Sequence, residues 1–169
     1  MSNIVRKISN VRSNLSYTVF NGHRISLNHK FEYSSRDDQN LLIPERSKWI
    51  TQNLLTTNIF AANYEAEFFK GKLRTNVFGK HAIYKTERIV PLSETNGVMA
   101  FRNEVSRANN QGYGGTLSYE PIKNGFLILS AEKSFLMPTD RHIFGAPEDN
   151  LLANPNISSE IAENFNLGG

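Results

Sequence analysis

The sequence predicts an all-β fold, an antiparallel up-and-down meander of about seven strands. In segment after segment, apolar and polar residues alternate with a period of two, which is typical of strands with two different faces. Very short turns occur at 20–23, 70–72 and 122–125. Longer polar stretches alternate with them, around 35–52, 87–112 and 137–157. Tight turns on one side and long loops on the other are typical of a membrane barrel, so the predicted architecture is a partial transmembrane β-barrel.

The first expected hairpin follows an irregular segment. Residues 1–13 show no clear period, so we expect an irregular N-terminal segment and a partial barrel over 14–169. A strand begins at Asn14 and ends at the Asn21-Gly22 turn, the strongest short-range hairpin signal. The return strand, 25–33, alternates cleanly, and His29 is the one polar residue on its apolar face.

The second and third hairpins are predicted by the same reasoning. Strands are expected over 53–68 and from Leu73 to Lys80, with Lys70-Gly71 between them. Because Phe78 and His81 break the alternation, we expect a β-bulge near Gly79. Further strands are expected at 115–120, 127–135 and 161–167.

Composition narrows the class of protein. The 169 residues carry 21% charged and 11% aromatic residues, a net charge of +3 and no cysteine. A nucleic-acid role gets little support because the basic residues do not cluster, and disulfides and thiolate metal sites are excluded. No apolar run approaches the roughly 20 residues of a membrane helix, so a barrel would be the only way to span a bilayer.

The two expected strand faces differ as the lumen and lipid sides of a barrel do. Large charged residues recur on the polar side: Lys30, Glu32, Glu65, Glu67, Arg74, Lys80, Glu120 and Glu132. Aromatic residues lie near strand ends and are candidates for an interfacial girdle: Tyr17, Tyr33, Phe68 and Phe135, with Trp49 as an anchor. Lys133 could extend toward the interface from the apolar side. Alternation alone fits a soluble β protein equally well.

The last third of the chain resembles TonB-dependent outer-membrane receptors, of the kind found in Bacteroidetes-like bacteria. Residues 126–138 are similar to a barrel strand of that family that ends in an aromatic residue and a proline. Residues 143–145 and 150–157 look like its long loop, and 159–168 look like its return strand. Phe78-Gly79-Lys80 resembles another of its barrel strands. The chain departs from the family at Leu136, where arginine is usual, and at Ser159, where proline is usual.

The resemblance implies a receptor in the outer membrane of a Gram-negative bacterium. Such a receptor takes up a scarce nutrient, an iron chelate, a cobalamin or a glycan, with energy delivered through TonB. Family barrels have about 22 strands around a plug, so this chain would be an internal piece of the later half. It has no recognisable signal peptide, plug or TonB-contacting segment. Its expected partners are lipid, the remaining barrel with its plug, and TonB through the missing N-terminal part.

No catalytic constellation emerges, and neither an enzyme nor a cofactor is expected. The four histidines are scattered, and Asp37-Asp38 is better explained as loop charge than as a Ca²⁺ site. Asp140, Arg141 and His142 are the candidate substrate-facing residues of the third loop. The rival prediction is a soluble β-sandwich or small-barrel binding module, and a passive porin-like channel is a third. We expect the isolated chain to aggregate or need detergent, because its two edge strands would be unpaired.

Overall fold

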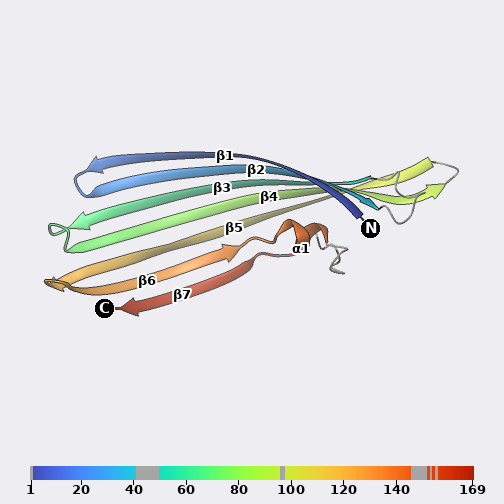
Figure 1. The fold of residues 1–169 in the computed structure, drawn as a ribbon. Coiled ribbons are helices and arrows are strands. Elements are labelled where there is room, and N and C mark those ends of the chain that lie inside the picture. The colour runs from blue at the N-terminus through green and yellow to red at the C-terminus, as the bar shows by residue number, and fades with distance from the viewer. Residues whose placement is uncertain (1, 41–49, 96–97, 146–151, 153, 155) are drawn as a thin grey trace.

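A computed structural model describes residues 2–40, 50–95, 98–145, 152, 154 and 156–169 (Figure 1). The described part is almost entirely β-strand, with one short helix. The elements are β1 (Ser2–Phe20), β2 (His23–Asn40), β3 (Ile50–Phe68), β4 (Leu73–Thr95), β5 (Val98–Ile122), β6 (Gly125–Leu136), α1 (Asp140–Phe144) and β7 (Glu160–Gly168).

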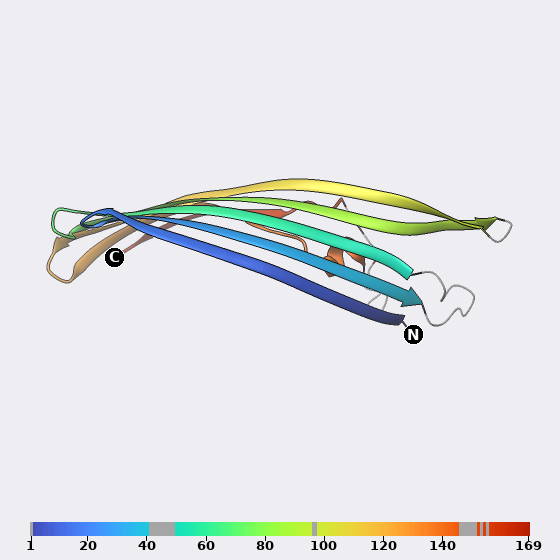
Figure 2. The same cartoon turned by 90° about the horizontal axis from the view of Figure 1, so that it is seen from above.

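The seven strands form one antiparallel sheet in which each strand pairs with its neighbours in the sequence, in the order β1 to β7. The predicted all-β meander of about seven strands is therefore confirmed. The sheet is not closed into a barrel, because β1 pairs only with β2 and β7 only with β6 among the described strands. Figures 1 and 2 show a long, twisted sheet with all three short turns at one end.

The three short turns are built where the sequence predicted them. Gly22 has φ 79° and Gly71 has φ 86°, a left-handed conformation that costs glycine little. Asn124, at φ 64°, plays the same role between β5 and β6. Its backbone N–H also donates a hydrogen bond of 3.1 Å to the Glu120 side chain. Asparagine tolerates this region better than most residues with a Cβ.

Three local predictions were wrong. Residues 2–13 are not irregular but form the first part of β1, in register with β2 as far as Asn40. The expected loop over 87–112 is largely strand, because β4 extends to Thr95 and β5 starts at Val98. The polar composition of this segment predicted a loop. A strand that has water on both faces does not need an apolar face, so the polar composition is compatible with a strand. The bulge near Gly79 is absent, and the register instead shifts between Thr18 and Phe20, Pro91 and Ser93, and Tyr119 and Ile122. The first expected loop, 35–52, lies partly outside the described residues.

The strand register sorts the side chains into two faces, since directly opposed residues share a face. We call one the apolar face. One residue per strand illustrates it: Leu15, Leu27, Phe60, Val77, Tyr113, Leu129 and Phe165. We call the other the polar face. It carries all eight of the charged residues predicted to share one side: Lys30, Glu32, Glu65, Glu67, Arg74, Lys80, Glu120 and Glu132.

The buried apolar core is small and lies against the polar face. It consists of Leu55, Tyr84, Ile143 and Phe144, with Ala108, Met137 and Ile157 packed around it. Leu55 and Tyr84 belong to the polar face by register, while Ile143 and Phe144 come from α1. Within the described residues, no helix is both long and apolar enough to span a membrane.

Candidate functional site

The β6–β7 connection, residues 137–159, folds back over the sheet. Its described parts include α1, which lies beside one face of the sheet, away from the short turns (Figures 1 and 2). The core cluster shows that this is the polar face, because the α1 side chains pack against Leu55 and Tyr84. The segment predicted as the third long loop is therefore partly anchored to the polar face of the sheet.

Two apolar side chains anchor the connection. Ile143 is 1% exposed and Phe144 is 5% exposed, although both belong to a helix of only five residues. Fully burying one large apolar side chain stabilises a structure by about 1.5–3 kcal/mol. Within the connection itself, the backbone N–H of Asn154 donates to the His142 carbonyl at 3.3 Å. The Tyr84 hydroxyl also donates to the Ile157 carbonyl, at 3.5 Å. Both ends of the connection therefore contact the same part of the sheet.

A buried arginine provides the strongest polar contact. Arg36, 4% exposed, donates from Nη1 to the Gly145 carbonyl at 3.0 Å. Gly145 follows α1 with φ 82°, which presents its carbonyl in a conformation favourable only to glycine. A hydrogen bond from a charged donor contributes about 1.5–3 kcal/mol. Arg36 therefore holds the end of α1 against β2.

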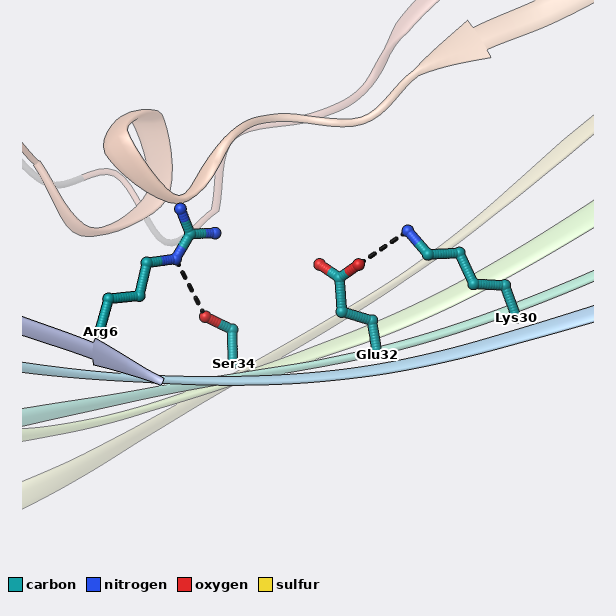
Figure 3. A network of polar contacts seen from close by, with 4 residues as sticks. All are labelled: Arg6, Lys30, Glu32 and Ser34. Carbon is teal, nitrogen blue, oxygen red and sulfur yellow. Dashed lines mark hydrogen bonds and ion pairs between the residues drawn. The ribbon is translucent and has the colours of Figure 1, made fainter. Parts of the chain in front are cut away.

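Charged side chains continue next to this contact, where they remain partly open to solvent. Figure 3 shows Arg6, Ser34, Glu32 and Lys30 rising from β1 and β2 on the side where α1 lies. Arg6 donates from Nε to the Ser34 hydroxyl at 3.4 Å, and Lys30 forms an ion pair with Glu32 at 2.7 Å. The side chains of Lys30 and Glu32 are only 31% and 24% exposed, so water screens this pair incompletely.

Between the connection and the sheet lies a hollow of about 240 Å³. The sheet contributes Arg6, Lys30, Glu32, Leu55, Thr57 and Tyr84, and the connection contributes Met137, Pro138, Thr139 and Ile143. Such a mixture of apolar walls and a few charged groups is typical of sites for small polar ligands. The hollow is the candidate functional site on the polar face.

A second polar hollow, of about 490 Å³, lies on the polar face near the short turns. Arg24, Glu65, Glu67 and Arg74 are among its lining residues. Arg74 and Glu67 form an exposed ion pair at 3.5 Å, and Asn63 donates to Glu65 at 3.1 Å. The carboxylates of Glu65 and Glu67 are thus paired with neighbouring side chains of the polar face. Such pairing is typical of a solvated charged surface.

The predicted substrate-facing residues all belong to α1. Asp140 begins the helix, and its side chain lies outside what the structure describes. Arg141 and His142 are exposed, while the next residue, Ile143, points into the core. The helix therefore places Arg141 and His142 beside the polar face of the sheet rather than on an outward excursion. Arg141 also takes part in a further interaction, so its side chain is not without a partner.

The predicted interfacial aromatic residues have different surroundings. Tyr33, 38% exposed, lies on the apolar face opposite Ser9 and Thr56. Phe68 lies beside the second short turn, with its ring edge-on to His23 at 5.2 Å. Phe135 packs under Lys80, whose Nζ lies 4.7 Å from the ring centroid and which belongs to the polar face. Trp49 lies outside the described residues.

Histidine 23 forms a contact that the sequence did not reveal. It is 8% exposed and shares a 2.7 Å hydrogen bond with the Tyr64 hydroxyl. Phe20 and Phe68 flank its ring, at centroid distances of 4.0 and 5.2 Å. His23 therefore belongs to an aromatic cluster at the turn end of the apolar face. In the described residues no group of three or more acidic, histidine or cysteine side chains could hold a metal ion.

The apolar face stays uncovered by the described chain. Its side chains are 47–80% exposed at one residue in each strand: Leu15, Leu27, Phe60, Val77, Tyr113, Leu129 and Phe165. Charges occur on this face mainly toward the end opposite the short turns: Lys7, Asp37, Lys85, Glu87 and Arg107. One ion pair lies elsewhere, where Lys133 on β6 donates to Glu163 on β7 at 3.0 Å. Lys133, which was predicted to extend toward an interface, thus forms a cross-strand contact in this structure.

Sequence reasoning predicted that Lys30 and Glu32 share one side, but it missed other residues that line the polar hollow or lie beside it. Arg6 lay in the segment expected to be irregular, and Arg36 in an expected loop. Leu55 and Ile143 are apolar, but Leu55 lies on the polar face by register, and nothing in the sequence indicated that Ile143 packs against it. Comparison with protein-family models, curated proteins and solved structures finds no match to this chain.

Proposed function

We propose that this chain forms part of the wall of an outer-membrane β-barrel, with its apolar face against lipid and its polar face toward the lumen. The observation that carries the proposal is the contrast between the two faces of one sheet. One face exposes large apolar side chains on all seven strands, whereas the other carries the eight charged residues named for the polar face and the folded connection.

The size of the exposed face favours lipid as its neighbour. Seven strands about 4.8 Å apart span roughly 29 Å, and the apolar stretch from Ile25 to Tyr33 extends roughly 27 Å along β2. The resulting area of sheet face is roughly 800 Å². Polar side chains such as His29 and His81 lie within it, but most of the large side chains on this face are apolar and exposed, whereas the largest apolar patch on a typical soluble monomer covers ~300–600 Å². Such a surface needs a permanent apolar neighbour.

The length of the apolar stretch agrees with a bilayer. On β4 the apolar face has no charged residue from Leu73 to Ile83, ten steps or roughly 33 Å of strand. A barrel strand tilted by about 40° would cover roughly 25 Å of membrane thickness with this stretch, the height of the apolar band of such barrels. Beyond it come Lys85 and Glu87, which form an ion pair. Since β4 has 23 residues and a membrane strand needs ~9–11, its remaining part would extend beyond the lipid.

The direction of the chain follows from the turns. Short turns belong on the periplasmic side of such barrels and long connections outside. The β6–β7 connection would then fold into the outer part of the lumen, where its hollow beside Arg6, Lys30 and Glu32 could contact a passing solute. We further propose, on the resemblance of residues 78–80 and 126–168, that the receptor is TonB-dependent and takes up an iron chelate, a cobalamin or a glycan. The chain would supply wall and loops rather than catalysis.

The edges of the sheet fit a partial wall. Both β1 and β7 have one side without a described partner strand, and unpaired backbone groups are costly in lipid. Further strands would have to pair with both edges in a closed barrel.

The decisive experiment maps which face meets lipid. The chain contains no cysteine, so single cysteines can carry nitroxide spin labels at Leu27 and Val77 on the apolar face. The adjacent Asn28 and Asn76 on the polar face are matched controls. In phosphatidylcholine vesicles we expect labels at Leu27 and Val77 to be accessible to oxygen, which concentrates in lipid. Labels at Asn28 and Asn76 should be accessible to a water-soluble nickel complex.

Equal accessibility to the nickel complex on both faces would contradict the proposal. The second candidate is the soluble binding module, and the Lys133–Glu163 ion pair on the apolar face favours it, because charges are costly in hydrocarbon. A monodisperse preparation without detergent would support that candidate. TonB dependence is tested separately: deleting the gene in its host should reduce nutrient uptake only while TonB is functional.

A further inference from the structure

A shallow groove of about 720 Å³ crosses the apolar face from β1 to β5. Leu15, Leu27, Phe60 and Tyr113 form much of its apolar lining, and Ala62 and Gly79 leave room in the middle. A Cβ added at Gly79 would meet no atom within 4 Å, which shows how open this part of the surface is. The groove therefore offers an extended apolar chain more contact than a flat sheet would.

Basic residues lie on the same face, farther from the short turns. Lys85 on β4 and Arg107 on β5 are directly opposed partners in the strand register. Like charges in that position destabilise a sheet. Glu87 neutralises part of the charge through its ion pair with Lys85, while Arg107 has no carboxylate partner in the part of the chain that the structure describes. The pair thus retains a net positive charge that an anion would offset.

The distance between the groove and the basic pair matches one leaflet of a bilayer. Six residues separate Gly79 from Lys85 along β4, roughly 20 Å of strand. A strand tilt of about 40° reduces this to roughly 15 Å along the membrane normal. Half of the ~30 Å hydrocarbon core is the same length. A lipid with its headgroup at Lys85 would therefore place its acyl chain over Ile83 and into the groove.

We propose that the apolar face holds a specific site for a membrane lipid with a phosphate headgroup. Lys85 and Arg107 contact the phosphate, and the groove around Gly79 takes an acyl chain. The inference rests on the proposed function, because it requires this face to contact a bilayer.

The test is native mass spectrometry of the full chain in detergent, with added dimyristoyl phosphatidylglycerol or dimyristoyl phosphatidylcholine. We expect the anionic lipid to bind more tightly than the zwitterionic one. Lys85→Gln combined with Arg107→Gln should weaken binding of the anionic lipid about thirtyfold, since each of the two surface cations contributes about 1 kcal/mol to attraction of an anionic lipid. Arg24→Gln combined with Arg74→Gln is the control, because it removes the same charge from the polar face, outside the groove.

The acyl-chain part of the site has its own variant. Gly79→Leu should fill the groove and weaken binding several-fold without unfolding the sheet, because its Cβ has free space. Gly168→Leu is the matched control, since it also meets no atom within 4 Å but lies on β7, outside the groove. If Gly79→Leu has no effect and inorganic phosphate displaces the lipid, the site binds a free anion and the proposal is wrong.

Failure of this site can be distinguished from failure of the proposed function. If the chain binds both lipids equally while the labels at Leu27 and Val77 are accessible to oxygen, the lipid-site proposal is wrong and the barrel-wall proposal stands. A chain that is monodisperse without detergent and binds neither lipid would overturn both. Dimerisation through the apolar face, with no lipid bound, would identify a second copy as its neighbour instead.

Discussion

Replacing Ile143 by alanine should release the β6–β7 connection from the sheet without unfolding the strands. Ile143 is 1% exposed and is the most deeply buried member of a cluster of only four residues. Isoleucine-to-alanine changes in cores cost about 2–5 kcal/mol. The cluster is small, and its other half comes from a five-residue helix that can move toward the sheet and close over part of the gap, so we expect the lower part of that range, about 2–3 kcal/mol.

This loss corresponds to about 30- to 140-fold more frequent opening of the connection. Hydrogen–deuterium exchange measures it directly, because the Ile143 amide donates to the Thr139 carbonyl at 3.1 Å. Exchange in peptides covering residues 139–145 should accelerate by that factor, while peptides from β3 should not change. Leu152→Ala is the control, since Leu152 is 86% exposed in the same connection and should change the free energy by less than about 0.5 kcal/mol.

Two outcomes would refute the reasoning. Unchanged exchange over residues 139–145 would mean that Ile143 does not anchor the connection. Equal acceleration in β3 and in the connection would mean that the two open together, as one cooperative unit.

Two further predictions concern single side chains. Arg36→Leu should also increase exchange over residues 139–145, by a factor equivalent to about 1–3 kcal/mol, because it leaves the Gly145 carbonyl without its charged donor. Unchanged exchange would show that this hydrogen bond contributes little. Gly22→Ala should destabilise the first hairpin by roughly 1–2 kcal/mol, because φ at residue 22 is 79° and the new Cβ would lie 3.2 Å from the Cβ of Glu67. In chemical unfolding, this variant should have a lower denaturant midpoint than the control Gly79→Ala, whose Cβ meets no atom within 4 Å.

The repeated pattern of short-range signals determined much of the fold. Asn21-Gly22 and Lys123-Asn124-Gly125 predicted turns because only a few residues accept positive φ, a property that depends on no distant contact. The period-two alternation also determined which residues share a face, as Lys30, Glu65 and Arg74 do. These features are local, so a single sequence is enough to predict them.

Strand length was not determined in this way. Residues 2–13 and 87–112 are polar, and a polar stretch resembles a loop when only alternation is considered. In the sheet, each of these segments is held by backbone hydrogen bonds to a neighbouring strand, which do not depend on the type of side chain. Pairing continues as long as the partner strand continues, so only the assembled sheet shows where strands end.

The candidate site depended on tertiary structure for the same reason. Arg6, Arg36 and Tyr84 share the polar face because their strands pair, and Ile143 joins them because the β6–β7 connection folds onto that face. The sequence by itself determined that the sheet has an apolar and a polar face, since that requires only alternation. Which face the connection covers was decided by long-range packing of two apolar side chains and one buried arginine, contacts that have no period along the chain.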